Sequence, residues 1–459
     1  MKKIGYWSII LLTINSIIGA GIFLSPGAVV QIAGGKTPFI YFCAALFAAI
    51  LAITFASAAK YVSNAGAAYA YAKAAFGDNI GFYVGITRFI AGCIAWGALA
   101  TGVVKTVLLI FGFDNTNFML VTFGFMILML VLLIINILGT KFFEVMNNIS
   151  TLGKLLALTT VIVAGFFIVF STGESHFNEI NLLKNDDGKP LIAEMNVTTF
   201  VTALIAAFYA FSGFESVASG SEDMKEPEKY LPRAIPVAIL IIAFIYISVI
   251  TATMMINPVA IVNAKEIITL VPVFDSPIVK NIILYGALVS MFGINVAASF
   301  HTPRLLEAIS KQKQIPEFLT YRTQQDCPIY AFLITIIIAI VLPMAFQYDM
   351  KSIIVLSSIS RFLQFLLVPI GVILFYFGKQ KGSVIARAKK HIVTDVVIPA
   401  FAFLLSLLLL IKFDWVGQFT IVEPSGLSHL NVFAIIAMII GYIGLPLLLY
   451  LLQSRKRTV

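Results

Sequence analysis

Long, uninterrupted apolar stretches recur along the whole chain, and they constrain its fold more than any other feature. A helix needs about 20 predominantly apolar residues to cross the roughly 30 Å hydrocarbon core of a membrane. Stretches of this kind leave no room for a separate soluble domain and predict an all-α membrane protein with about twelve transmembrane helices. The expected spans cover approximately positions 5–30, 38–59, 82–112, 118–138, 149–171, 198–220, 234–256, 279–301, 329–347, 352–377, 394–412 and 431–452.

The composition excludes several other classes of protein. Of the 459 residues, 60% are hydrophobic and 12% are charged, whereas soluble domains are about 45–50% apolar and about 25% charged. A soluble enzyme and a disordered protein are therefore excluded, and continuous rather than alternating apolar runs exclude an outer-membrane barrel. The three cysteines, Cys43, Cys93 and Cys327, are too far apart to indicate a disulfide framework or a metal site.

Basic residues predict the orientation of the chain in the membrane. An even number of spans puts both termini on one side, and the termini and loops of that side hold 21 of the 31 Lys and Arg residues, against 8 on the opposite side. Because loops rich in Lys and Arg stay in the cytoplasm, we expect a multi-pass protein of the cytoplasmic membrane with both termini cytoplasmic. This bias also accounts for the net charge of +9 without a nucleic-acid partner.

Two expected spans contain sequences that disfavour a continuous helix. The first span carries Gly19 and Gly21 on either side of one alanine, and each glycine costs about 1 kcal/mol relative to alanine in a helix. Close packing of helices through small residues is the alternative interpretation. The sixth span carries Gly213, followed by Glu215. A carboxylate at that depth is expensive unless it is paired or hydrated, so Glu215 is a functional candidate, although it could instead hold the broken helix through backbone N–H groups.

The positions of the two interruptions predict the organisation of the fold. Gly21 and Gly213 are 192 residues apart, at corresponding places in spans 1 and 6. Paired interrupted spans indicate an inverted-repeat transporter, here a single domain over 1–459 with a first repeat of about 5–171, a second of about 198–377 and two additional helices over about 394–452. A broken helix exposes N–H groups at one new end and C=O groups at the other. Facing breaks therefore suit both charged groups of an α-amino acid.

At these residues the chain resembles the amino acid–polyamine–organocation (APC) transporter superfamily. Similarity to that family's signatures covers essentially the whole chain, in the segments Gly19 to Phe23, Phe211 to Ser216, Glu222 to Pro227, Leu231 to Pro236 and Arg304 to Pro316. The resemblance implies a leucine-transporter-type 5+5 inverted repeat with broken helices 1 and 6.

The resemblance also implies which residues touch the substrate. The substrate carboxylate would meet N–H groups around Ala20, Gly21 and Ile22, and its amino group would meet carbonyls near Ile17, Tyr209 and Ser212. Tyr209 or Phe211 could act as an aromatic gate. Ala298 falls where some exchangers of cationic substrates carry a large aromatic residue, which argues against a diamine or arginine-type site. The expected substrate-binding residues are Ile17, Gly19, Ala20, Gly21, Ile22, Tyr209, Phe211, Ser212 and Gly213.

Four charged residues inside or close to expected spans are candidates for a role in transport or in packing. Lys154 lies in span 5, where a lysine can extend its ammonium to the cytoplasmic headgroups. The resemblance implies another role, because several sodium-independent family members carry a lysine there in place of a sodium ion. Its ammonium would bond carbonyls freed at the first break and exchange protons during transport, so we assign Lys154 and Glu215 to coupling or gating. We interpret Arg361 as an anchor between helices and expect Asp395 to be solvated.

The residues together predict secondary active transport of amino acids without sodium, by proton symport or amino-acid exchange. A polyamine or cationic amino-acid antiporter is the alternative, and a channel is a further one. A membrane enzyme would need a catalytic cluster, and none is evident. No phosphate-binding loop occurs, so ATP-driven transport is not indicated, and the sequence predicts no cofactor and no metal. The expected partners are the amino-acid substrate, protons and the lipid bilayer.

Overall fold

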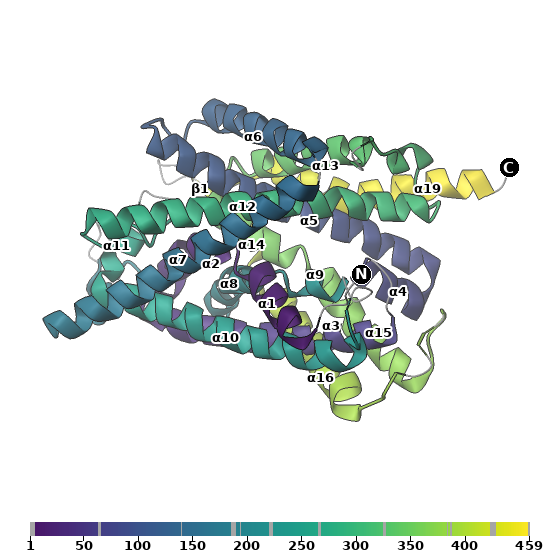
Figure 1. Ribbon diagram of the computed structural model, residues 1–459, viewed down its shortest axis with the longest axis horizontal. Coiled ribbons are helices and arrows are strands. Elements are labelled where there is room, and N and C mark those ends of the chain that lie inside the picture. The colour runs from purple at the N-terminus through teal and green to yellow at the C-terminus, as the bar shows by residue number, and fades with distance from the viewer. Residues whose placement is uncertain are drawn as a thin grey trace.

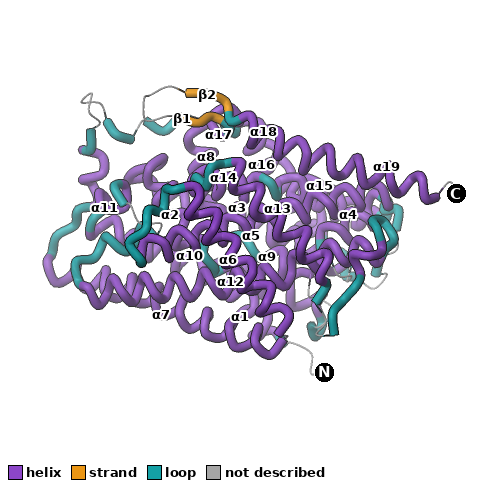
Figure 2. Tube along the Cα trace, turned by 90° about the horizontal axis from the view of Figure 1, so that it is seen from above, coloured by secondary structure: helices purple, strands orange, loops and turns teal. Residues whose placement is uncertain are grey.

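Helices make up nearly all of the structure, which is a computed structural model. It describes residues 5–62, 66–138, 140–184, 190–192, 194–219, 224–264, 268–324, 327–382, 384–385, 388–422 and 428–457. Within these residues the only paired strands are β1 (Thr420–Val422) and β2 (Ser428–Leu430), which form a short antiparallel hairpin with Ile421 opposite His429. Figure 2 shows this hairpin at one edge of the helical assembly.

The helices follow the apolar stretches of the sequence. Nine helices of the described chain are long and apolar enough to cross a membrane, and three shorter apolar helices, Tyr6–Ile17, Val197–Phe211 and Ile329–Ala345, accompany them. Each stretch expected to be a span contains one or more of these helices. The chain is therefore an all-helical, multi-pass membrane protein. The principal helices are α1 (Tyr6–Ile17), α2 (Gly21–Ala33), α3 (Thr37–Tyr61), α4 (Ala68–Phe76), α5 (Asp78–Ile110), α6 (Phe118–Leu138), α7 (Thr140–Thr172), α8 (Val197–Phe208), α9 (Phe214–Ser219), α10 (Pro227–Ile256), α11 (Pro258–Val262), α12 (Pro277–Lys311), α13 (Ile329–Ala345), α14 (Met350–Ile359), α15 (Phe362–Phe377), α16 (Ile398–Lys412), α17 (Trp415–Gln418), α18 (Val432–Ile439) and α19 (Leu445–Arg457).

Short helices occupy the middle of the bundle, and long helices surround them (Figure 1). The extensive contacts are α12 with α7 and α5, α10 with α3 and α1, and α2 with α8. At the periphery, α6, α16 and α18 expose large apolar side chains such as Phe123, Leu404 and Phe433. Apolar side chains on the outside of a bundle are favourable in lipid, so the interior must be held together by close packing and by hydrogen bonds.

Asp395, expected to be solvated, is instead fully buried in an ion pair. Both of its carboxylate oxygens accept hydrogen bonds from Lys60 Nζ at 2.7 Å, and Tyr61 donates a third at 2.7 Å. The expectation was wrong because Lys60 and Asp395 are 335 positions apart. Only the packing against α3 of the turn η6 (Val393–Val397), which leads into α16, brings them together. This contact ties the start of α16 to the bundle.

Candidate functional site

The first span is interrupted where the glycines predicted it. Helix α1 ends at Ile17, Ile18 leaves the helical conformation (φ −70°, ψ 85°), and α2 begins at Gly21. No side chain caps the start of α2. Since the first N–H groups of a helix have no partners within it, the α2 N-terminus presents donors and a partial positive charge at this point.

The sixth span is interrupted in a similar way. Helix α8 ends at Phe208, the single 3₁₀ turn η3 (Tyr209–Phe211) follows, and α9 begins at Phe214. Between them Ser212 is extended (φ −66°, ψ 146°). Gly213 has a φ of +120°, a conformation that residues with a side chain rarely adopt. Gly213 is thus needed for the path of the backbone itself.

The two interruptions pack directly against each other. A Cβ atom added to Gly21 would lie 2.5 Å from Ala210 Cα, and one added to Gly213 would overlap the carbonyl oxygen of Ser16. Each glycine therefore lies against backbone of the other broken helix, and neither position has room for a side chain. The two interpretations of the first break, an interrupted helix and close packing through small residues, both describe what is observed.

Tyr246, which sequence reasoning did not identify, connects the two breaks. Its hydroxyl lies 3.2 Å from the carbonyl oxygen of Ala210 and 3.5 Å from that of Ile17. The ring of Phe211 packs against the Tyr246 ring, with centroids 5.1 Å apart. Because Tyr246 comes from α10, within neither broken span, no spacing in the sequence pointed to it.

Lys154 extends toward the first break, and the residue is only 3% exposed. Its ammonium donates hydrogen bonds to the carbonyl oxygens of Asn15 at 2.9 Å and Ile18 at 2.7 Å. One turn earlier on α7, the Thr151 hydroxyl donates to the side chain of Asn15 at 2.8 Å. The ammonium thus lies inside the protein, on carbonyls at the end of α1, rather than at the headgroups. Thr151 and Asn15 are further residues that the sequence did not indicate.

Glu215 is buried in an ion pair just after the second break. Its carboxylate accepts a hydrogen bond from the Gly213 N–H at 3.0 Å and one from Arg361 Nη1 at 2.9 Å. A second arginine, Arg88, lies within electrostatic reach of this carboxylate and donates to Gln364 at 2.6 Å. The bond to Gly213 corresponds to the structural role considered for Glu215, and Arg361 joins α9 to the junction of α14 and α15.

The remaining predicted residues lie around the two breaks. Among the described residues, the buried hydroxyl of Tyr209 has no hydrogen-bond partner, and Ser212 Oγ donates to Phe208 O at 3.5 Å. A Cβ on Gly19 would lie 3.2 Å from the Ile294 side chain. Ile17, Ala20, Ile22 and Phe211 are buried. Glu222 and Asp223, part of one family-like segment, lie outside the described residues.

A multi-pass helical membrane protein with two broken helices in contact at its centre fits the class of membrane transporters. Proteins similar in sequence belong to the same class. The family model described as "Amino acid permease" matches residues 4–445. An uncharacterized transporter of Mycobacterium tuberculosis is 37% identical over 98% of this chain and 95% of its own length. The Serine/threonine exchanger SteT of Bacillus subtilis is 30% identical over 69% of each chain. The Branched-chain amino acid permease BcaP of Lactococcus lactis is 24% identical over 86% of each.

The chain belongs to the amino acid permease family of the APC superfamily. It is therefore a transporter and not an enzyme, and membership of this superfamily implies the leucine-transporter-type fold.

Proposed function

We propose that this protein carries amino acids across the cytoplasmic membrane by secondary active transport without sodium. In this proposal the α-carboxylate of the substrate is held by N–H groups around Ala20, Gly21 and Ile22. Its α-amino group is held by carbonyls near Ile17, Tyr209 and Ser212. The observation that carries the proposal is the direct contact of the two breaks, in which Gly21 lies against Ala210 and Gly213 lies against Ser16.

The contact between the breaks places partners for both charges of a zwitterion near each other. The uncapped start of α2 supplies donors, and these favour a carboxylate. The chain leaves α1 at Ile17 and η3 at Phe211, and the carbonyls there supply acceptors. The Ile17 and Tyr209 carbonyls accept the N–H groups of Gly19 at 2.7 Å and Ser212 at 3.2 Å, and each has a second lone pair for an ammonium. Tyr246, within hydrogen-bond distance of a carbonyl from each break, would hold the two segments in register.

Independence from sodium is supported by the position of Lys154. Its ammonium bonds two carbonyls at the end of α1, and carbonyl oxygens of this kind are what a sodium ion would otherwise bind. A lysine can lose and regain its proton, whereas a bound metal ion must dissociate. This arrangement supports coupling to protons through Lys154, and exchange of one amino acid for another is the other sodium-independent mechanism in the proposal.

A neutral amino acid is a better candidate substrate than a polyamine or a cationic amino acid. A cationic side chain needs a carboxylate beside the central site, and Glu215, the candidate for that role, is already paired with Arg361. Two relatives are named for neutral substrates, serine and threonine in one case and branched-chain amino acids in the other. Relatives named as cationic amino acid transporters of Arabidopsis thaliana are 23% identical.

The proposal includes a topology. About twelve spans would form a single domain with a first repeat over about 5–171, an inverted second repeat over about 198–377 and two further helices over about 394–452. Both termini would be cytoplasmic, because most Lys and Arg residues lie in the loops of that side. Labelling of single cysteines from either side of intact cells tests this orientation.

Uptake into proteoliposomes tests the function. Purified protein is reconstituted, and labelled neutral, cationic and acidic amino acids are supplied with and without sodium, a pH gradient and internal amino acid. We expect saturable uptake of a neutral amino acid that persists without sodium. Single-channel currents without saturable counterflow would instead identify a channel, and preferential uptake of putrescine or arginine would support the cationic alternative.

A further inference from the structure

A cavity of about 420 Å³ lies away from the two breaks, where α2 ends. Its wall on one side is the end of α2 with the turn Gly34–Lys36, and on the other the connection between α7 and α8, including the 3₁₀ helix Phe177–Leu182. The first span runs from the N-terminus to this point, so in the proposed topology the cavity opens on the outer side of the membrane. The transport site described above does not include it.

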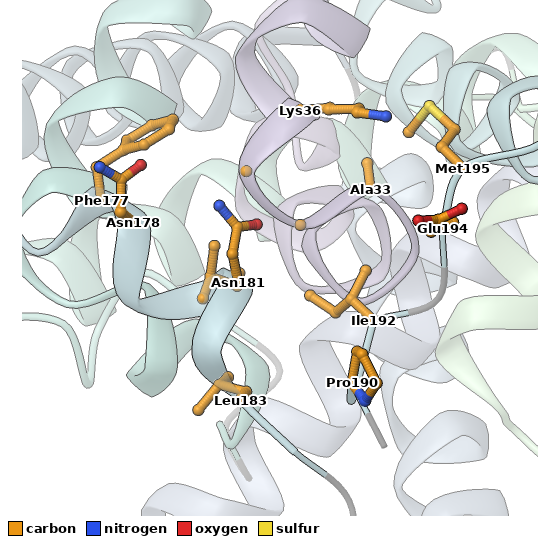
Figure 3. Close-up of a pocket in the computed structure, with 13 residues that line it drawn as sticks. Ala33, Lys36, Phe177, Asn178, Asn181, Leu183, Pro190, Ile192, Glu194 and Met195 are labelled. Atoms are coloured by element: carbon orange, nitrogen blue, oxygen red, sulfur yellow. The ribbon is translucent and has the colours of Figure 1, made fainter.

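Opposite charges and an apolar surface line this cavity. Figure 3 shows Lys36 and Glu194 on one side, beside Met195, and Phe177 and Asn181 on the other. Within the described part of the chain, no ion pair or side-chain hydrogen bond engages either Lys36 or Glu194. Both charges are therefore available to a ligand that carries a carboxylate and an ammonium.

Two glycines let the two walls of the cavity pack closely against each other. A Cβ on Gly35 would lie 3.2 Å from Asn181 Oδ1, and one on Gly34 would lie 3.1 Å from the Ile192 side chain. Gly34 also has a φ of +53° as the helix ends, which glycine tolerates best. Ala33 and Gly34, at the carboxyl end of α2, line the same space, and the partial negative charge of a helix C-terminus favours an ammonium group.

We propose that this cavity, here called the outer cavity, is a second binding site for a neutral α-amino acid with an apolar side chain, occupied before the substrate reaches the breaks. The substrate carboxylate pairs with Lys36, its ammonium with Glu194 and the end of α2, and its side chain packs against Phe177, Ile192 and Met195. This inference rests on the proposed function for the identity of its ligand. A zwitterion fits better than a simple cation or anion because the outer cavity supplies both charges.

Direct binding to a variant with a disabled central site tests the inference. The Gly21→Leu protein is purified in detergent, its folding is checked by size-exclusion chromatography and circular dichroism, and binding of labelled L-valine is measured by equilibrium dialysis. We expect L-valine to bind the Gly21→Leu protein, and the affinity to fall at least about tenfold when Lys36→Gln or Glu194→Gln is added. Valinamide, which lacks the carboxylate, and isovalerate, which lacks the ammonium, should compete poorly.

Matched controls separate this site from the central one. Lys280→Gln removes another lysine near the same expected side, outside the outer cavity, and should leave L-valine binding unchanged. Lys36→Arg, which keeps the charge, should retain most of the affinity lost in Lys36→Gln. Absence of L-valine binding to a folded Gly21→Leu protein would overturn the outer cavity proposal, and so would equal binding by the Lys36→Gln and Glu194→Gln variants.

Transport kinetics distinguish failure of this inference from failure of the proposed function. In an otherwise unaltered chain, Lys36→Gln should raise KM for L-valine uptake from the outer side about fivefold or more and leave KM from the cytoplasmic side unchanged. If the wild type takes up amino acids and Lys36→Gln leaves the KM on both sides unchanged, the outer cavity is not a substrate site and the proposed function still stands. A wild-type protein that neither transports nor binds any amino acid would contradict both.

Discussion

The ammonium of Lys154 donates a hydrogen bond of 2.7 Å to the carbonyl oxygen of Ile18, although the two residues are 136 positions apart. Ile18 directly follows the last residue of α1, so its carbonyl has no continuing helix to bond. A buried carbonyl without a donor costs about 1–3 kcal/mol, and Lys154 removes that cost. The break in the first span is therefore stabilised from α7.

Lys154→Ala should lower transport sharply and flatten its dependence on pH. The substitution leaves the carbonyls of Asn15 and Ile18 without their donor, and this shifts the balance between conformations by roughly 1–3 kcal/mol per group. It also removes the group that we propose to exchange protons. Initial rates of uptake between pH 5 and 8 test this, with Lys105→Ala as the control for loss of a lysine from a span. Superimposable pH curves for wild type and Lys154→Ala would contradict the role of Lys154.

Replacing sodium with choline should leave the initial rate of uptake within about twofold of the rate in sodium. The reason is that Lys154 supplies the positive charge that a metal ion would otherwise provide to the carbonyls at the end of α1. Uptake is measured in liposomes prepared with both salts at equal ionic strength. A strict requirement for sodium would show that Lys154 does not take the place of the ion.

Gly21→Leu and Gly213→Leu should each abolish transport in a protein that still inserts into the membrane. Each leucine side chain would clash with backbone atoms of the opposite break, and overpacking of this kind costs about 1–3 kcal/mol or more. Gly5→Leu is the matched control, because a Cβ on Gly5 meets nothing within 4 Å. Normal uptake by both variants would show that the contact between the breaks is not part of the site.

Tyr246→Phe should reduce uptake by roughly fivefold while the protein folds normally. One hydroxyl serves carbonyls at both breaks, and a typical hydrogen bond contributes about 0.5–1.5 kcal/mol. Phe keeps the ring contact with Phe211, so only the polar contact is lost. Tyr285→Phe, at an exposed tyrosine on α12, provides the comparison. An unchanged rate in Tyr246→Phe would mean that this hydroxyl does not hold the two segments in register.

Arg361→Gln should destabilise the protein more than the double variant Arg361→Gln with Glu215→Gln. Removing one member of a buried ion pair typically costs about 3–5 kcal/mol because the other charge loses its hydrogen-bonded partner, whereas two neutral amides can bond each other. Thermal unfolding of the purified proteins measures the difference. If the single and double variants unfold at the same temperature, the pair in the structure contributes little to stability.

The sequence by itself determined the helical membrane class, the approximate position of every long apolar helix and the location of both interruptions. These features are local. The length of an apolar segment decides whether it prefers lipid, and glycine marks where a helix is easily broken. Each feature is visible within one segment of the sequence, as the break is at Gly19 to Gly21.

Only the tertiary structure decided which groups meet. Four features join residues from different helices: Tyr246 at both breaks, Asn15 beside Thr151, Lys60 paired with Asp395, and the cavity at Lys36. The spacing of residues along the chain cannot indicate such partners. A side chain on a membrane-spanning helix can face any of several neighbouring helices, and only the packing of the bundle selects one. Asp395 illustrates the physical reason: its position near the start of a span suggested water, but the packing of η6 and α16 against α3 placed an ammonium there instead.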